Sequence, residues 1–120
     1  MRKFVHPVVA MFCLLAVLLA CKLNGNKSSK DVKASCDMRA AGTGSSSSIC
    51  IDFYEEPNAK VKEICSDDKG YTLANKPCDH STALGGCKRG NATNWYYSSS
   101  HHSTADDVKK ECESDFVPAN

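Results

Sequence analysis

The hydrophobic and polar positions divide the chain into three parts. A basic start, Arg2 and Lys3, precedes an apolar run that extends from Val8 to Ala20. This run is too short to cross a bilayer, which takes about 20 apolar residues, so residues 1–20 are typical of a secretory signal peptide. Residues 21–35 are polar and predict a flexible tether. Residues 36–120 alternate short aromatic clusters with turn residues and predict one folded domain.

A repeated pattern within residues 36–120 predicts the fold. Each copy contains a Cys, an aromatic strand, a helix of the form Val-Lys-x-x-Cys and a second short strand; the copies run from Cys50 to Leu73 and from Cys87 to Val117. Aromatic and β-branched residues between turn residues indicate the strands. The Val and Cys of each helix are four residues apart and share one helical face, which we expect to point inward. We therefore predict an α+β domain of two strand-helix-strand repeats that form one small sheet with two short helices.

Capping residues support the two predicted helices. Pro57 suits the first turn of the first helix, since it needs no amide hydrogen there. Ser103 or Thr104 can cap the second helix, and Asp106 and Asp107 complement its dipole.

Disulfides are expected because a domain of this size has a marginal apolar core. In a strand-helix unit the helix runs back over the strand, so a Cys that starts the strand and a Cys that ends the helix meet at one end. This predicts Cys50–Cys65 and Cys87–Cys112, which leaves Cys36–Cys78, each bond contributing roughly 2 to 4 kcal/mol. Six cysteines allow fifteen connectivities. The main competitor pairs Cys36 with Cys50, Cys78 with Cys87 and Cys65 with Cys112.

The end of the apolar run identifies the type of signal. Leu18-Leu19-Ala20-Cys21 resembles the lipobox of bacterial lipoproteins. The resemblance implies that the Cys21 thiol receives a diacylglyceryl group, that cleavage makes Cys21 the first residue, and that a fatty acid such as palmitate is added to its amine. The alternative is an ordinary signal peptide, with Cys21 paired inside the fold.

Cysteine counting favours the lipid anchor. Of eight cysteines, Cys13 lies in the removed segment and Cys21 carries lipid, which leaves an even six for disulfides. Dense disulfides occur in exported domains, so the count agrees with the signal. In lipoproteins of cells with two membranes, an Asp directly after the lipidated Cys retains the protein at the inner membrane. This chain has Lys22 at that position. In such a cell we therefore expect the protein at the outer membrane.

Charge differs between the tether and the domain. Four lysines and one aspartate lie in residues 21–35, whereas residues 36–120 hold nine basic and thirteen acidic residues. A basic segment beside a lipid anchor is attracted to anionic head groups, although lysines also simply keep a linker solvated. The acidic domain argues against binding to nucleic acid.

The spacing of cysteines and aromatic residues also resembles a group of small cysteine-rich bacterial lipoproteins and exported proteins of uncharacterised function. The features that carry it are Cys50, Tyr54, Cys65, Gly70-Tyr71, Cys78, Gly85-Gly86-Cys87, Trp95-Tyr96-Tyr97, Cys112 and Phe116-Val117-Pro118. This resemblance implies no activity. The chain departs from the group's pattern at residues 66–70, where a double glycine is usual, and in lacking a glycine beside Phe116.

Three histidines are the candidate metal ligands. His80, His101 and His102, together with Asp79, Asp106 and Asp107, offer imidazole and carboxylate groups that suit zinc or copper. A solvated loop is the favoured interpretation, because adjacent histidines in an extended segment point in different directions. The serine runs at residues 45–48 and 98–100 lack the setting of a catalytic nucleophile, so we predict neither an enzyme nor a cofactor.

Aromatic residues are the candidate binding groups. Strand alternation sends Trp95 and Tyr97 to one face and Tyr96 to the other. Exposed rings stack on sugars or anchor protein partners, which would suit an envelope polysaccharide or protein. The alternative, which we favour, is that the rings fill the core. The sequence thus predicts a lipid-anchored binding or structural domain of the bacterial envelope; a metal binder, or a small inhibitor or enzyme, are the alternatives.

Overall fold

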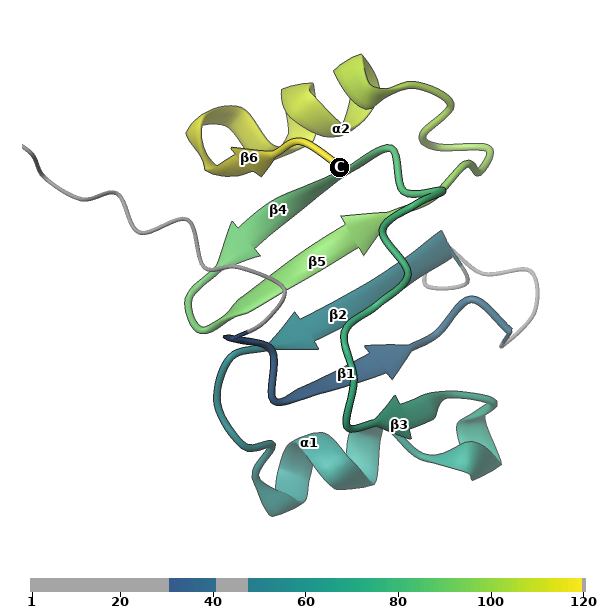
Figure 1. Cartoon of the computed structure of the whole chain (residues 1–120). Helices are drawn as coiled ribbons and strands as arrows, with labels where there is room; N and C mark the ends of the chain where they lie inside the picture. Colours follow the sequence, from purple (N-terminus) through teal and green to yellow (C-terminus); the bar gives the residue numbers. More distant parts are fainter. Residues whose placement is uncertain (1–30, 41–47, 120) are drawn as a thin grey trace, which may run out of the picture.

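The computed structural model describes residues 31–40 and 48–119 and contains one six-stranded antiparallel sheet (Figure 1). The strand order is β3-β1-β2-β5-β4-β6. The strands are β1 (Ala34–Asp37), β2 (Ile49–Phe53), β3 (Thr72–Ala74), β4 (Gly85–Arg89), β5 (Ala92–Tyr96) and β6 (Phe116–Val117). Two α-helices, α1 (Ala59–Ile64) and α2 (Ala105–Cys112), and two short 3-10 turns, η3 (Asp67–Lys69) and η4 (Glu113–Asp115), complete the chain. The predicted disulfide-stapled α+β class is confirmed.

The sheet consists of two similar halves. Its strand order reads the same from both edges when β1 is matched with β4, β2 with β5 and β3 with β6. Each half is a hairpin followed by a helix and a short edge strand, and β2 pairs with β5 where the halves meet. The predicted repeat is therefore present, but its first copy begins one strand earlier than the pattern indicated, at β1 rather than at Cys50, whereas the second begins at β4, the strand that contains Cys87. β1 also begins at Ala34, just before the predicted start of the domain at residue 36.

The disulfides follow these halves, which corrects two of the three predicted pairs. Cys87–Cys112 is formed as predicted, whereas the other two bonds are Cys36–Cys65 and Cys50–Cys78. Cys36 of β1, not Cys50, corresponds to Cys87 of β4, because each half joins its first strand to the end of its helix. The predictions of Cys50–Cys65 and Cys36–Cys78 were wrong because the pattern did not identify β1 as a strand. The neighbour-pairing alternative does not occur either.

The two faces of the sheet are covered differently. Cys36 and Cys87 point to one face, which we call the helix side, and their disulfides attach the C-terminal end of α1 to β1 and that of α2 to β4. On the opposite face, the loop side, residues 75–84 cross the strands on the way from β3 to β4 (Figure 1). The side chains of β2 and β5 on the loop side are buried, whereas those on the helix side are mostly half-exposed.

The helices begin at capping residues, as expected. Thr104 caps α2 in a capping box with Asp107, which agrees with the prediction. The cap of α1 is Asn58, so Pro57 lies before the helix rather than in its first turn. The inward face predicted for α2 is confirmed by Val108 and Cys112, which are 0% and 3% exposed.

Candidate functional site

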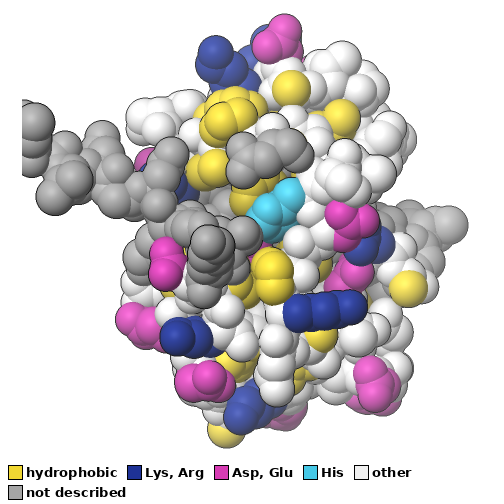
Figure 2. Space-filling model, viewed as in Figure 1, with side chains coloured by type: hydrophobic (Ala, Val, Ile, Leu, Met, Phe, Trp, Pro, Cys, Tyr) yellow, Lys and Arg dark blue, Asp and Glu magenta, His cyan; other side chains and the backbone are white. Residues whose placement is uncertain are grey.

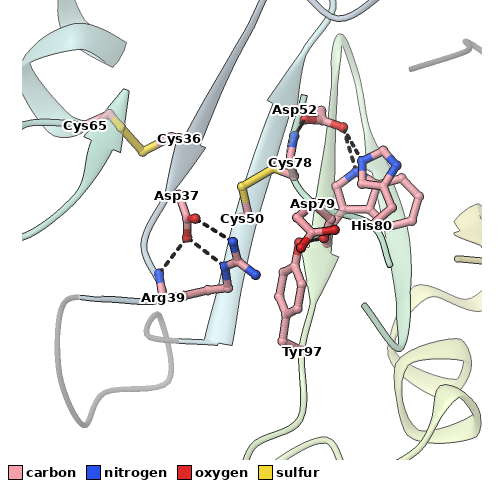
Figure 3. Close-up of a disulfide and its surroundings, with 11 residues drawn as sticks. Cys36, Asp37, Arg39, Cys50, Asp52, Cys65, Cys78, Asp79, His80 and Tyr97 are labelled. Carbon is pink, nitrogen blue, oxygen red and sulfur yellow. Dashed lines mark hydrogen bonds and ion pairs between the residues drawn. A yellow bond between two sulfur atoms is a disulfide. The ribbon is translucent and has the colours of Figure 1, made fainter. Parts of the chain in front are cut away.

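A buried carboxylate organises the loop side of the sheet. Asp52 lies in β2, one of the two central strands, with 0% of its surface exposed. Its Oδ1 accepts a hydrogen bond from the backbone nitrogen of Cys78 at 2.7 Å, and its Oδ2 accepts one from Nε1 of Trp95 at 2.8 Å. Nε2 of His80 lies 2.8 Å from the same Oδ2 (Figure 3). Because an unpaired buried carboxylate is very costly, these contacts are what allow Asp52 to remain inside the domain.

His80 completes this cluster from the crossing loop. Its ring lies on Trp95, with ring centroids 4.0 Å apart and an angle of 30° between the planes, and its side chain is 16% exposed. An imidazole paired with a buried carboxylate resembles part of a catalytic triad. The nearby Ser81 hydroxyl, however, donates to Asp79 Oδ1 at 2.6 Å. The Asp52–Cys78 and Asp52–His80 contacts, together with the Cys50–Cys78 disulfide, fasten residues 75–84 to the sheet (Figure 3).

The other two histidines lie on the helix side, away from His80. His102 packs edge-on against Tyr96 and places Nε2 at 2.5 Å from Oε2 of Glu111, while the Tyr96 hydroxyl donates to Oε1 of Glu111 at 2.9 Å. His80 packs on Trp95, the neighbour of Tyr96 in β5, and successive strand residues face opposite sides of a sheet. The proposed metal site of His80, His101 and His102 is therefore wrong. Residues 31–40 and 48–119 contain no cluster of three side chains that could hold a metal ion.

Two carboxylates that accept side-chain hydrogen bonds, Glu111 and Asp37, have pKa values below their ordinary values. Burial alone would raise the pKa of Glu111, but the hydrogen bonds from Tyr96 and His102 outweigh it and lower that pKa. For Asp37, the hydrogen bond from the Arg39 side chain is the main cause of its lowered pKa. Both groups are therefore anionic at neutral pH.

The three candidate aromatic residues are buried in the core. Trp95, Tyr96 and Tyr97 are 4%, 5% and 7% exposed, so none of them is a surface anchor, and the core-filling interpretation is confirmed. Tyr97 donates its hydroxyl to the carbonyl oxygen of Asp79 at 2.6 Å, and the Arg39 guanidinium lies 4.3 Å from the centre of its ring. Burial raises the pKa of Tyr97 to about 12.

Sequence reasoning missed Asp52 and Glu111. A signal for Asp52 does exist, since a single carboxylate interrupts the apolar and aromatic strand Ile51-Asp52-Phe53-Tyr54 at a position where alternation predicts an inward side chain. Glu111, in contrast, lies in an ordinary charged helix. The lipidation residue Cys21, the signal peptide and most of the tether lie outside the described residues. Within the described ranges, no helix has the length and the apolar character that a membrane span requires.

Comparisons with protein-family models, with curated proteins and with solved structures find no match to this chain.

Proposed function

We propose that this chain is a lipoprotein of the bacterial cell envelope, anchored through Cys21, whose folded domain binds a partner rather than catalysing a reaction. The supporting observation is the pairing of the six cysteines of the described domain. They form three bonds with one another, a pattern that indicates an exported protein. Cys21 is thus not needed by the fold, and its thiol is available for acylation.

The tether supports membrane attachment. The segment after Cys21 carries four lysines, and a basic segment near an anionic bilayer gains up to about 1 kcal/mol per charge close to the surface. Lys22 directly after Cys21 favours the outer membrane where a cell has two. The acidic domain would be held off the same surface by like charge.

Binding is favoured over catalysis because the polar groups of the domain are engaged with each other. The Asp52 carboxylate is occupied by three partners, two of which are Trp95 and His80. Glu111 keeps more of its side chain accessible, 43%, and is better placed to meet a partner than to act on a substrate.

Expression of the full chain in a bacterium that processes lipoproteins tests the anchor. We expect the wild-type protein to enter the detergent phase in a phase-partition assay and Cys21→Ser to remain aqueous. Cys13→Ser is the matched control, since it removes a thiol from the apolar run that cleavage discards, and it should partition like the wild type. Equal partitioning of Cys21→Ser and wild type would refute the lipid anchor.

A further inference from the structure

The helix side of the sheet has an open strip between its two helices. The strip consists of the helix-side residues of the central strands, Ile49, Ile51 and Phe53 of β2 and Ala92, Asn94 and Tyr96 of β5. All except Tyr96 are half-exposed, whereas Cys50, Asp52, Thr93 and Trp95, which point to the loop side of the same strands, are at most 4% exposed. Apolar surface in the middle of the sheet is therefore accessible from the helix side.

The disulfides fix the walls of this strip. Cys36–Cys65 ties the end of α1 to β1, and Cys87–Cys112 ties the end of α2 to β4. β2 and β5 are the two strands between these, so α1 and α2 flank the strip at opposite edges of the sheet (Figure 1). Each bond therefore keeps the end of its helix at one side of the strip.

A hollow lies at each end of the strip. One has a volume of about 460 Å³ and is lined by Ile49, Tyr96, His101, His102 and Glu111. The other has a volume of about 190 Å³ and is lined by the opposite strand ends, Phe53 and Ala92, together with groups from α1 and the loop before it. Since Ile49 and Phe53 are four residues apart, the two hollows are separated by about 13 Å, the length of a short extended peptide segment.

Acidic side chains lie at both ends. Glu111 lines the larger hollow, while Glu55 and Glu56 line the smaller one, where Arg89 is the single Lys or Arg among the described lining residues. Hydrogen bonds from Tyr96 and His102 hold Glu111 in place. An apolar floor with anchored carboxylates at its ends is complementary to an extended chain that carries positive charges.

We infer that the helix-side strip binds an extended basic polypeptide segment, with a lysine or arginine side chain directed into the hollow at Glu111. This inference rests on the proposed binding function but not on the lipid anchor. Carbohydrate is disfavoured because stacking on sugar requires an exposed ring face, whereas Tyr96 is only 5% exposed and Phe53 is half-buried. A second copy of the chain is disfavoured because facing strips would bring carboxylates against carboxylates.

The loop side is a poorer binding surface. Figure 2 shows that charged side chains of both signs are spread over the described part of this face. Its buried groups are occupied by the crossing loop, since Cys78 donates to Asp52 and the His80 ring packs on Trp95. We therefore assign the partner to the helix side.

Fluorescence anisotropy of a labelled peptide with the full chain in detergent tests the inference. The probe is a fluorescein-labelled nonapeptide of alternating lysine and valine; a matched peptide has glutamate in place of lysine. We expect saturable binding of the basic peptide alone. Glu111→Gln should weaken binding by about fivefold to tenfold, as for the loss of one charge-assisted hydrogen bond. Asp67→Asn, the same charge change at an exposed site on η3, should leave binding unchanged.

Further measurements distinguish peptide binding from self-association and from carbohydrate binding. Ile51→Lys places a cation on the strip floor and should weaken binding by at least about tenfold through charge repulsion, with melting temperature and circular dichroism checking the fold. Equal affinity of Glu111→Gln and Asp67→Asn for the basic peptide, or equal binding of both peptides, would overturn the inference. So would a dimer in sedimentation that Ile51→Lys dissociates, or binding of a neutral oligosaccharide that Glu111→Gln weakens. Because the peptide assay does not depend on acylation, its failure is distinct from failure of the Cys21 test.

Discussion

Asp52 and Trp95 occupy equivalent positions in the two halves of the sheet and are hydrogen-bonded to each other across the junction between β2 and β5. The strand register shows that the positions are equivalent. Asp52 pairs with Ser35, the residue before Cys36 in β1, and Trp95 pairs with Gly86, the residue before Cys87 in β4. The same position thus holds the acceptor in one half and the donor in the other. This difference allows the two halves to join through a specific bond.

Removing the carboxylate should destabilise the domain strongly. Asp52→Ala leaves the amide of Cys78 and the indole NH of Trp95 buried without their acceptor, and we expect a loss of about 3 to 5 kcal/mol in the free energy of unfolding. Urea denaturation measures this loss. Asp67→Ala, on the exposed η3 turn, is the control and should change the free energy by less than about 0.5 kcal/mol. A similar small effect for both variants would contradict the role assigned to Asp52.

The Cys50–Cys78 bond should matter even though it has no counterpart in the second half of the sheet. We expect the double variant Cys50→Ala/Cys78→Ala to lose about 2 to 4 kcal/mol of unfolding free energy. Cys87→Ala/Cys112→Ala should lose a similar amount, because the two disulfides close loops of similar length, with their cysteines 28 and 25 residues apart in the sequence. Only the first variant should also increase proteolysis of residues 75–84. Identical cleavage patterns for the two variants would argue against this bond fastening the crossing loop.

The cap of α2 predicts a pH dependence. Hydrogen bonds from the Ser103 backbone, and from Thr104, lower the pKa of Asp107 to about 2. Because this folded-state pKa is below the ordinary value of 3.8, the carboxylate stabilises the fold above about pH 4, and the contribution is lost as the pH falls toward 2. We expect the melting temperature of Asp107→Asn to be lower than that of wild type at pH 5 and to approach it at pH 2. A constant difference between the two curves would show that the cap is not charge-dependent.

Tyrosine titration tests the core on the loop side. Since burial raises the pKa of Tyr97 to about 12, the folded state holds this proton more tightly than the unfolded state. Its contribution is complete below the ordinary pKa of 10 and decreases as the pH rises from there toward 12. Absorbance at the phenolate band should show a late-titrating tyrosine that is missing in Tyr97→Phe. Retention of that late step in Tyr97→Phe would assign it to another residue.

The repeat, the helices and the fold class could be predicted because they follow from local patterns. β1 and β4 were missed, because their sequences, Ala34-Ser35-Cys36-Asp37 and Gly85-Gly86-Cys87, contain no aromatic residues. In β4 small residues are required: a Cβ on Gly86 would lie 3.0 Å from the Trp95 ring and 2.9 Å from the Thr93 side chain. The sequence of β4 does not look like a strand, because the side chains of Thr93 and Trp95 fill the space that a larger side chain at Gly86 would need. Missing β1 then produced the two wrong disulfides.

The candidate site was less predictable because it depends on contacts distant in the sequence. Asp52 meets Cys78 and Trp95, which are 26 and 43 residues away. The burial of Asp52 depends on residues 75–84 crossing the sheet, and no local pattern indicates that path. The histidines were grouped by residue type, whereas the sheet separates His80 from His102. The burial of Trp95 to Tyr97 was foreseen from the shortage of aliphatic residues.

The most direct test of the account is the intact mass of the mature protein from a bacterial host, measured before and after reduction. We predict a chain that starts at Cys21, carries the mass of a diacylglyceryl group and a fatty acid there, and gains six hydrogens when its three disulfides are reduced. A mature chain without acyl groups that starts at another residue, or an uncleaved chain that gains eight hydrogens because Cys21 is paired with Cys13, would contradict the account.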